Sequence, residues 1–372
     1  MAYVAPGWAG GPVVCSASRG GGVPVIEIAA LGSADRAARG RVADQIGRAA
    51  SEIGMFYVRG HGIDPDLFAR VHAHAAAFFA LPEEVKLAYH IARSANHRGY
   101  VPFSEKGDYD DEPGERLYEA FDSALELPAY HAAARASRLM GPNVWPALPG
   151  FRRTVTEYYR AVALVGRRMC RAFEIYLGLD DGYFDRYMRT PTSQLRLLHY
   201  VENDAPSREE QMTMGAHTDY ESFTLLHQWA PGLQSMTVDG RWVDVPPIPG
   251  TLVVNIGDLM EVWTNGLFVS NPHRVLNSGR ERFSMPFFVA ADHDAVVEPV
   301  ASTVTADRPA AYGPLVAGEH LLAQLERDFP YLRSRGAPGE PIERRAEGAA
   351  RPYINPFEAS KLRRHEAVGQ AA

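Results

Sequence analysis

The chain has 372 residues, of which 46% are hydrophobic and 22% are charged, a balance typical of a folded globular protein and not of a disordered or fibrous one. The net charge of −7, without blocks of like charge, disfavours nucleic acid or an anionic membrane as a partner. Cys15 and Cys170 fit neither a disulfide framework nor a cysteine-based metal site. Because we find no apolar run of membrane-spanning length and no signal-peptide pattern, we expect a cytoplasmic protein, with its oligomeric state left open.

The N-terminal half reads as a tail followed by a mixed region of helices and strands. Residues 1–22 are rich in glycine and lack periodicity, so we expect a mobile tail, and residues 23–190 form the mixed region. Apolar spacing and turn residues predict strands over 23–28 and 55–58, and helices over 34–53, 66–80 and 151–178. Ser33 is the expected N-cap of the first helix. Residues 93–150 are loop-rich, and their acidic stretch, Asp108 to Glu115, is expected to be a solvated loop.

After Pro191 the pattern changes to short runs typical of strands, separated by Gly, Pro, Asn and Asp. The predicted strands cover residues 194–201, 222–229, 233–238, 241–245, 251–256, 273–277 and 283–290. Such a series predicts an antiparallel sandwich or barrel, here over residues 191–300. A helix over 318–328 lies in a C-terminal segment, 301–333, expected to pack on this core. Residues 334–372 are expected to form a mobile tail.

Three residues form a candidate metal site. His217 and Asp219 are two apart, so in a strand they would point to the same side, and His273 would join them from a distant strand. Two histidines and one carboxylate leave half of an octahedron open, which suits Fe(II) that must bind a co-substrate and O2 together. A lone His-x-Asp is weak support for a metal site. Its spacing from His273 and from Arg282-Phe283-Ser284 carries the weight.

At that spacing the chain resembles the isopenicillin N synthase-like branch of the Fe(II)/2-oxoglutarate-dependent dioxygenases. The resemblance covers about residues 23–330. Beyond the His-x-Asp, distal His and Arg-x-Ser elements, further motifs of that family recur in both halves. They are Val23-Pro24-Val25-Ile26, Gly54-Met55-Phe56-Tyr57-Val58, His61-Gly62-Ile63, Phe78-Phe79 with Leu81-Pro82, Arg98-Gly99-Tyr100, Gly232-Leu233-Gln234, Arg241-Trp242-Val243-Asp244-Val245, Pro249-Gly250 and Asn255-Ile256-Gly257-Asp258.

The resemblance implies an α+β fold, a double-stranded β-helix (a jelly roll) with flanking N-terminal and C-terminal helices. It implies Fe(II) held by His217, Asp219 and His273, and a co-substrate carboxylate held by Arg282, Ser284 and Tyr200. It also implies that 2-oxoglutarate and O2 become succinate and CO2 while a small-molecule substrate is hydroxylated, desaturated or cyclised. The family often has Asn-x-Tyr where this chain has Leu198-His199-Tyr200, which weakens the inferred hold on 2-oxoglutarate near the iron.

The substrate contacts are predicted from strand alternation. Arg196 shares a strand face with Leu198 and Tyr200, which suggests a substrate carrying an anionic or strongly hydrogen-bonding group. Phe288 shares the face of Arg282. Candidate wall residues, for which core packing is the competing explanation, are Tyr100, Phe103, Phe121 and Tyr220. Asn255 and Asp258 are expected to shape a turn.

Three other functions compete with this interpretation. Isopenicillin N synthase itself uses the same iron without 2-oxoglutarate, and its Arg-x-Ser binds the substrate's own carboxylate. A catalytically silent binding protein could keep the fold, although the intact His217, Asp219 and His273 argue against it. A zinc hydrolase could use the same three ligands, but no residue in the sequence stands out as its general base.

Overall fold

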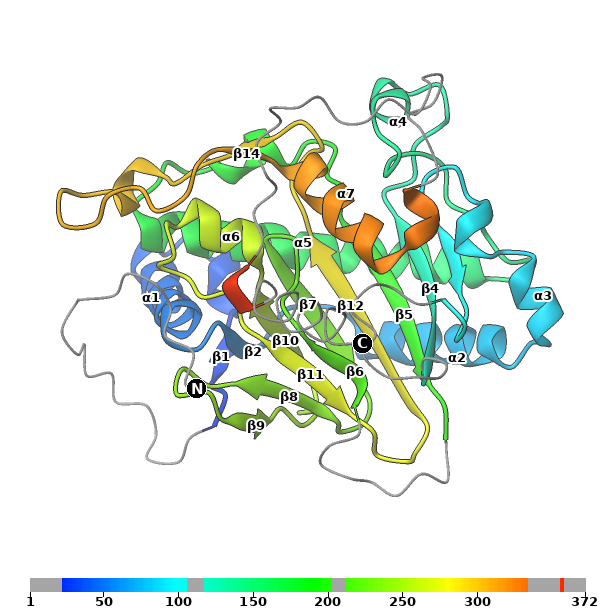
Figure 1. The fold of residues 1–372 in the computed structure, drawn as a ribbon. Helices are drawn as coiled ribbons and strands as arrows, with labels where there is room; N and C mark the ends of the chain where they lie inside the picture. Colours follow the sequence, from blue (N-terminus) through cyan, green and yellow to red (C-terminus); the bar gives the residue numbers. More distant parts are fainter. Residues whose placement is uncertain (1–21, 106–116, 203–211, 334–354, 358–372) are drawn as a thin grey trace, which may run out of the picture.

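The computed structural model describes residues 22–105, 117–202, 212–333 and 355–357. The expectations for residues 1–21, for the acidic stretch Asp108 to Glu115, and for residues 334–354 and 358–372 lie outside this part of the chain. The described residues form two main β-sheets with helices around them (Figure 1).

The larger sheet has eight strands in the order β1-β2-β10-β7-β12-β5-β4-β3. Neighbouring strands are antiparallel except β1 and β2, which are parallel. The strands are β1 (Val25–Glu27), β2 (Met55–Arg59), β3 (Gly99–Val101), β4 (Tyr118–Ala124), β5 (Gln194–Tyr200), β7 (Phe223–Gln228), β10 (Thr251–Ile256) and β12 (Arg282–Val289).

The smaller sheet has four antiparallel strands in the order β6-β11-β8-β9. Its strands are β6 (Met212–His217), β8 (Leu233–Met236), β9 (Trp242–Asp244) and β11 (His273–Leu276). From β5 to β12 the chain alternates between the two sheets, apart from the β8–β9 hairpin. This winding is that of a double-stranded β-helix, so the expected fold class is confirmed. A separate hairpin joins β13 (Val296–Val297) to β14 (Leu315–Val316).

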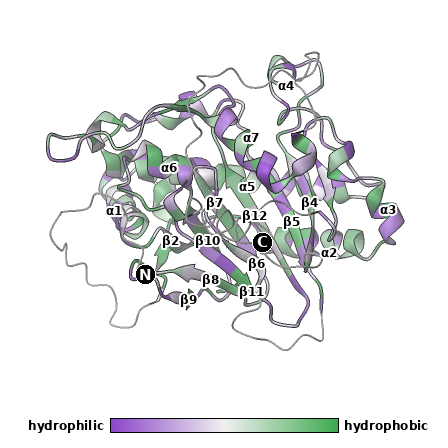
Figure 2. Cartoon of the chain, in the orientation of Figure 1, coloured by the Kyte–Doolittle hydropathy of each residue, from purple (hydrophilic) through white to green (hydrophobic). Residues whose placement is uncertain are grey.

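The helices α1 (Arg36–Glu52), α2 (Pro65–Phe79) and α5 (Phe151–Leu177) share one apolar core with the larger sheet. The remaining α-helices are α3 (Glu83–Leu87), α4 (Ala132–Ala136), α6 (Asp258–Trp263) and α7 (Ala317–Asp328). Figure 2 shows the apolar colouring of central strands such as β7 and the polar colouring of the peripheral α3. Among the described residues, no helix combines the length and the apolarity that crossing a bilayer requires.

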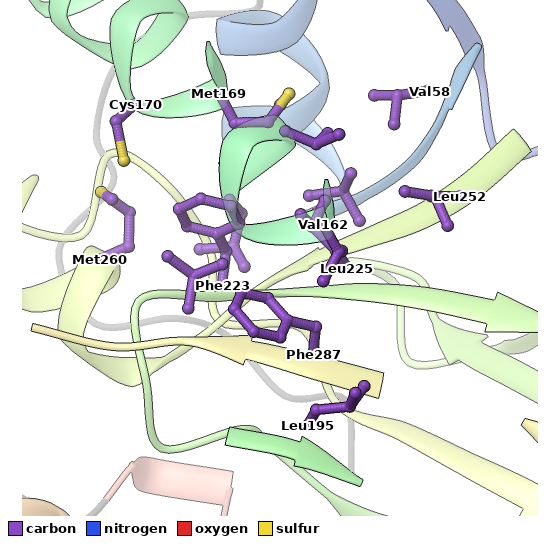
Figure 3. Packing of buried hydrophobic residues seen from close by; sticks show 14 of the residues in the cluster. Val58, Val162, Met169, Cys170, Leu195, Phe223, Leu225, Leu252, Met260 and Phe287 are labelled. Atoms are coloured by element: carbon purple, nitrogen blue, oxygen red, sulfur yellow. The ribbon is translucent and has the colours of Figure 1, made fainter. Parts of the chain in front are cut away.

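Strand alternation separates this core from the interior of the barrel. On β7, Phe223 and Leu225 point to α5 and pack beside Val162 and Met169, as Figure 3 shows. Leu226, on the opposite face of β7, belongs to a second apolar cluster inside the barrel. Because side chains alternate along a strand, the strands that pack against α5 also present residues to the barrel interior.

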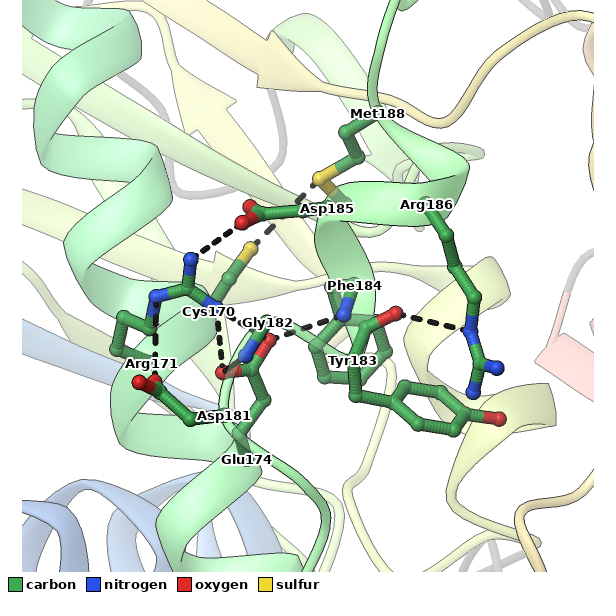
Figure 4. A network of polar contacts seen from close by, with 10 residues as sticks. All are labelled: Cys170, Arg171, Glu174, Asp181, Gly182, Tyr183, Phe184, Asp185, Arg186 and Met188. Carbon is green, nitrogen blue, oxygen red and sulfur yellow. Dashed lines mark hydrogen bonds and ion pairs between the residues drawn. The ribbon is translucent and has the colours of Figure 1, made fainter.

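The loop after α5 is fastened by a buried carboxylate (Figure 4). Glu174 accepts hydrogen bonds from the backbone N–H groups of Gly182 and Phe184, at 2.9 Å each, and Arg171 bridges Glu174 and Asp185. This loop lies between α5 and β5. Cys170 lies beside it and is buried, as expected of a small apolar residue, and burial raises the pKa of its thiol.

Two local predictions were wrong. The region expected to be loop-rich contains β4, which is buried along its whole length, because the charges of Glu119 and Asp122 hide the strand pattern while Lys86 and Arg196 neutralise them inside the fold. The N-cap of α1 is Asp35 and not Ser33, since its carboxylate accepts from the first free N–H groups of the helix.

Candidate functional site

His217 and His273 face each other across the smaller sheet. They end β6 and begin β11, where their Cα atoms are direct partners, and their ring centroids are 4.3 Å apart. Nδ1 of His217 lies 2.8 Å from the carbonyl oxygen of Gly215, and Nδ1 of His273 lies 3.0 Å from that of Asn271. A nitrogen that faces a carbonyl oxygen carries the proton, so each Nε2 keeps its lone pair for a metal.

Asp219 supplies an oxygen between the two rings. Its Oδ1 lies 3.7 Å from Nε2 of His217 and 3.6 Å from Nε2 of His273. Its Oδ2 accepts hydrogen bonds from the Thr224 hydroxyl and from Nδ2 of Asn255, the latter at 2.6 Å. Burial by itself would raise the pKa of Asp219, but the charge of the two histidines when they are protonated, together with these hydrogen bonds, lowers it. The hydrogen bonds also orient the carboxylate when the imidazoles are neutral.

Strand alternation does not bring Asp219 to the histidines, contrary to the sequence argument. Asp219 lies beyond the end of β6, and the segment after β10 holds it in place. The N–H of Asp258 donates to the Asp219 carbonyl at 2.9 Å. A Cβ on Gly257 would lie 2.3 Å from the Glu221 carbonyl oxygen, so only glycine permits this backbone approach. Asn255, expected only to shape a turn, contacts Asp219 directly.

These three side chains fit a divalent metal. One nitrogen from each histidine and one oxygen from Asp219 lie within 4.8 Å of one another. Two neutral imidazoles and a carboxylate, each oriented by a further hydrogen bond, are suitable ligands for Fe(II) with open positions.

Arg282 lies deep in the barrel on β12. Its Nη1 donates to Oγ of Ser284 at 3.1 Å and its Nη2 donates to Oε1 of Gln228 at 3.1 Å, while its guanidinium lies 4.7 Å from the ring centroid of Tyr200. Arg282 is only 3% exposed, and no acidic side chain among the described residues pairs with it. Desolvation lowers its pKa. A buried cation without a counter-charge is costly, so this position suits an anionic ligand.

The candidate metal ligands and Arg282 face the same space inside the barrel. Thr224, which holds Asp219, and Gln228, which holds Arg282, are four apart on β7 and therefore share a face. That separation is about 13 Å along the strand, a span that an arginine side chain and a small dicarboxylate can fill together. Sequence reasoning missed Thr224 and Gln228, although their even spacing on a predicted strand was a usable signal.

Arg196 lies on the barrel face but is already paired. Its Nε and Nη2 each donate to a different oxygen of Asp122, both at 2.8 Å, and its guanidinium lies 5.9 Å from the ring centroid of Phe329. Asp122 is fully buried on β4, the strand that sequence reasoning missed. The pair leaves only Nη1 of Arg196 without a hydrogen bond among the described residues. The side chain can therefore donate a hydrogen bond to a ligand, but it contributes little net positive charge.

The aromatic candidates divide between the two faces of the larger sheet. Phe288 is half-buried and shares the face of Arg282, and Tyr220 is half-buried with its hydroxyl 3.1 Å from Oδ2 of Asp328. Tyr100 and Phe121 are cross-strand partners that pack against Phe78 of α2, so they belong to the core behind the sheet and not to the pocket wall. Phe103 lies half-buried just beyond β3.

Comparisons with known proteins agree with this geometry. Residues 23–148 match the profile described as non-haem dioxygenase in morphine synthesis N-terminal, and residues 191–291 match that of the 2OG-Fe(II) oxygenase superfamily. The chain is 34% identical over 316 residues to the 2-oxoglutarate-Fe(II) type oxidoreductase hxnY of Emericella nidulans, covering 82% of this chain and 90% of that protein. It is 34% identical over 302 residues to the homoarginine-6-hydroxylase 2-ODD-233 of Oryza sativa, covering 78% and 90%. The crystal structure of a full-length Neurospora crassa protein in complex with alpha-KG is similar with a TM-score of 0.73 and 28% identity, covering 82% and 95%.

Proposed function

The chain belongs to the 2OG-Fe(II) oxygenase superfamily, and from that premise we propose how its own residues divide the work. The protein is an oxidoreductase that uses Fe(II), 2-oxoglutarate and O2 to oxidise a small substrate. The enzyme class and cofactors expected from the sequence are thereby confirmed. The roles of individual residues and the chemistry of the substrate are the content of the proposal.

His217, Asp219 and His273 hold the iron. The observation that carries this assignment is the convergence of two Nε2 atoms and one carboxylate oxygen, each side chain oriented from behind by a further hydrogen bond. When Fe(II) is bound there, it supplies the redox chemistry that couples the conversion of 2-oxoglutarate and O2 into succinate and CO2 to oxidation of the substrate. Asn255 and Thr224 keep Oδ1 of Asp219 turned toward the metal.

Arg282, Ser284 and Tyr200 bind the carboxylate of 2-oxoglutarate that lies away from the iron. Arg282 supports this role because its charge is buried and unbalanced among the described residues, and the oxygen of Gln228 orients it. A carboxylate beside this guanidinium would balance the charge and accept charge-assisted hydrogen bonds. The ring of Tyr200 would lie against one side of this carboxylate.

The substrate is expected to lie near Arg196, Phe288 and Tyr220. Asp122 neutralises Arg196, so we infer a substrate that presents a hydrogen-bond acceptor, such as a carbonyl oxygen, to Nη1. Related proteins differ in their substrates: one is named as a homoarginine hydroxylase, and the Neurospora crassa protein has been crystallised with thymine. Arg196→Ala should raise the substrate KM while 2-oxoglutarate affinity stays unchanged, and an unchanged substrate KM would remove Arg196 from the pocket.

The test of the metal and co-substrate assignments measures succinate. Metal-free protein receives Fe(II), ascorbate, 2-oxoglutarate and air, first alone and then with candidate substrates. We expect succinate that depends on Fe(II), that rises with a true substrate, and that disappears in His217→Ala. His131→Ala, which alters a histidine at the N-terminus of α4, is the matched control and should keep the activity. Equal succinate from His217→Ala and wild type would refute the ligand assignment.

A further inference from the structure

Three residues close to the C-terminus, Asn355–Phe357, are packed beside α6 instead of belonging to a tail (Figure 1). The Asn355 side chain is 1% exposed. Its Nδ2 donates to Oδ1 of Asp258 at 3.0 Å, and its Oδ1 accepts from the N–H of Phe357 at 2.9 Å. The sequence prediction of a mobile tail is therefore wrong at these positions.

Asp258 connects to both sides of the metal site. Its N–H holds the carbonyl of Asp219, as described above, and its Oδ1 also accepts from Oγ of Ser270 at 2.7 Å. Ser270 precedes Asn271, whose carbonyl oxygen accepts the hydrogen bond from Nδ1 of His273. One buried residue thus links the loop that carries Asp219, through its backbone N–H, to the segment that orients His273, through its carboxylate.

The surroundings of Asp258 leave little room for adjustment. The N–H of Gly257 donates to the backbone carbonyl of Ser222 at 3.0 Å, and the N–H of Leu259 donates to the backbone carbonyl of Glu221 at 3.2 Å. The start of α6 is therefore hydrogen-bonded to the loop after Asp219. Asp258 is itself 1% exposed. A displacement of its carboxylate would therefore reach the metal ligands instead of being absorbed by solvent.

We propose that Asn355 is a positioning residue for the metal centre, acting through Asp258 on Asp219 and His273. This inference rests on the proposed assignment of the metal ligands. Its physical basis is that a buried carboxylate must keep its hydrogen-bond donors. Without Nδ2 of Asn355, Asp258 turns or takes up water, and the oxygen that holds Ser270 moves with it. The C-terminal segment thereby completes a site whose ligands all lie far away in the sequence.

The test measures the affinity of the metal-free protein for Mn(II), by the EPR signal of free Mn(II), without 2-oxoglutarate. Changes to partners behind metal ligands weaken metal binding by about 10- to 100-fold, and we expect about tenfold for Asn355→Ala. Asn143→Ala is the matched control, because that amide also makes two hydrogen bonds, to the backbone of Ala124. The control should bind Mn(II) as wild type does, even where its unfolding midpoint falls.

An exchange of the two side chains tests the contact directly. Asn355→Asp places two carboxylates together and should bind Mn(II) more weakly than Asn355→Ala. The double variant Asp258→Asn/Asn355→Asp restores one donor and one acceptor and should recover most of the affinity. If Asn355→Ala is too unstable to assay, this double variant decides: recovered affinity supports the proposal, and folded protein with weak binding overturns it.

The outcomes separate this inference from the proposed function. If wild type binds no Mn(II), the ligand assignment itself fails. If wild type binds Mn(II), His217→Ala does not, and Asn355→Ala binds as tightly as wild type, only the positioning role of Asn355 is overturned.

Discussion

Two arginines inside the barrel, the buried Arg282 and the half-buried Arg196, should respond in opposite ways to the same substitution. Arg282 makes hydrogen bonds to neutral groups but has no acidic partner among the described residues, whereas Arg196 forms a two-point ion pair with Asp122. Arg282→Met should leave the free energy of unfolding of the ligand-free protein unchanged or raise it by about 1–2 kcal/mol, because a desolvated charge is removed. Arg196→Met should lower it by about 3–5 kcal/mol, because Asp122 is left buried and unpaired.

Affinity for 2-oxoglutarate should change in the reverse pattern. Loss of one partner of a buried, hydrogen-bonded charge pair costs about 2–5 kcal/mol of binding free energy. At about 1.4 kcal/mol per tenfold, Arg282→Met should therefore raise the dissociation constant of 2-oxoglutarate by about 30-fold to a few thousandfold. Arg196 lies beside the pocket but does not hold that carboxylate. The dissociation constant of 2-oxoglutarate for Arg196→Met should therefore stay near that of wild type.

Urea unfolding of the metal-free protein gives the stability of each variant, and calorimetric titration of the Mn(II)-loaded protein gives the affinity for 2-oxoglutarate. The two variants serve as controls for each other, since both remove a guanidinium from neighbouring strands, β12 and β5. The reasoning is refuted if Arg282→Met destabilises the protein as much as Arg196→Met does. It is also refuted if folded Arg282→Met binds 2-oxoglutarate within threefold of wild type.

Three further predictions concern acid stability and the groups behind Asp219. Burial lowers the pKa of His227 to about 4, so as pH falls the unfolded chain binds a proton before the folded protein does. The free energy of unfolding should therefore fall by about 3 kcal/mol between about pH 6.5 and pH 4. His227→Leu should reduce this pH dependence in urea unfolding, and a variant with the same pH dependence as wild type would contradict the prediction. Asn255→Ala removes a donor to Asp219 and should weaken Mn(II) binding at least tenfold, so unchanged binding would exclude this role. Gly257→Ala forces a Cβ against the Glu221 carbonyl, and we expect loss of Mn(II) binding with about 1–3 kcal/mol of destabilisation in urea; a variant equal to wild type would show that the backbone yields.

The candidate ligands could be selected from the sequence because the His-x-Asp, distal His and Arg-x-Ser elements of the resembling family recur at that family's spacing. His217, Asp219 and His273 are ordinary ligand types, and Arg282 with Ser284 form a short motif whose even spacing puts both on one strand face. The long helix α5 and most core strands were also predictable, since their apolar periods are strong. The candidate donors were therefore predictable from the sequence, whereas the arrangement that orients them was not.

Where local pattern and tertiary environment disagreed, the predictions were wrong. The strand β4 carries Glu119 and Asp122, whose charges indicate solvent exposure when the sequence is considered alone. In the fold, Lys86 and Arg196 from distant segments pair with them. The wall assignments of Tyr100 and Phe121 depended on which face of the larger sheet each occupies. That choice is set by cross-strand register and by packing against α2, and neither leaves a local signal.

An antiparallel sandwich or barrel and the candidate metal ligands could be predicted along the chain from periodicity and short motifs, and the family resemblance specified the double-stranded β-helix and the candidates for the co-substrate carboxylate. Three features needed the folded molecule: Asp258 and Gly257 set the position of Asp219, Asp122 neutralises Arg196, and Asn355 donates a hydrogen bond to Asp258 from a distant part of the chain. Buried polar groups must find partners wherever the fold brings a donor and an acceptor together. Those partners are separated by long stretches of chain, so no local sequence pattern predicts them.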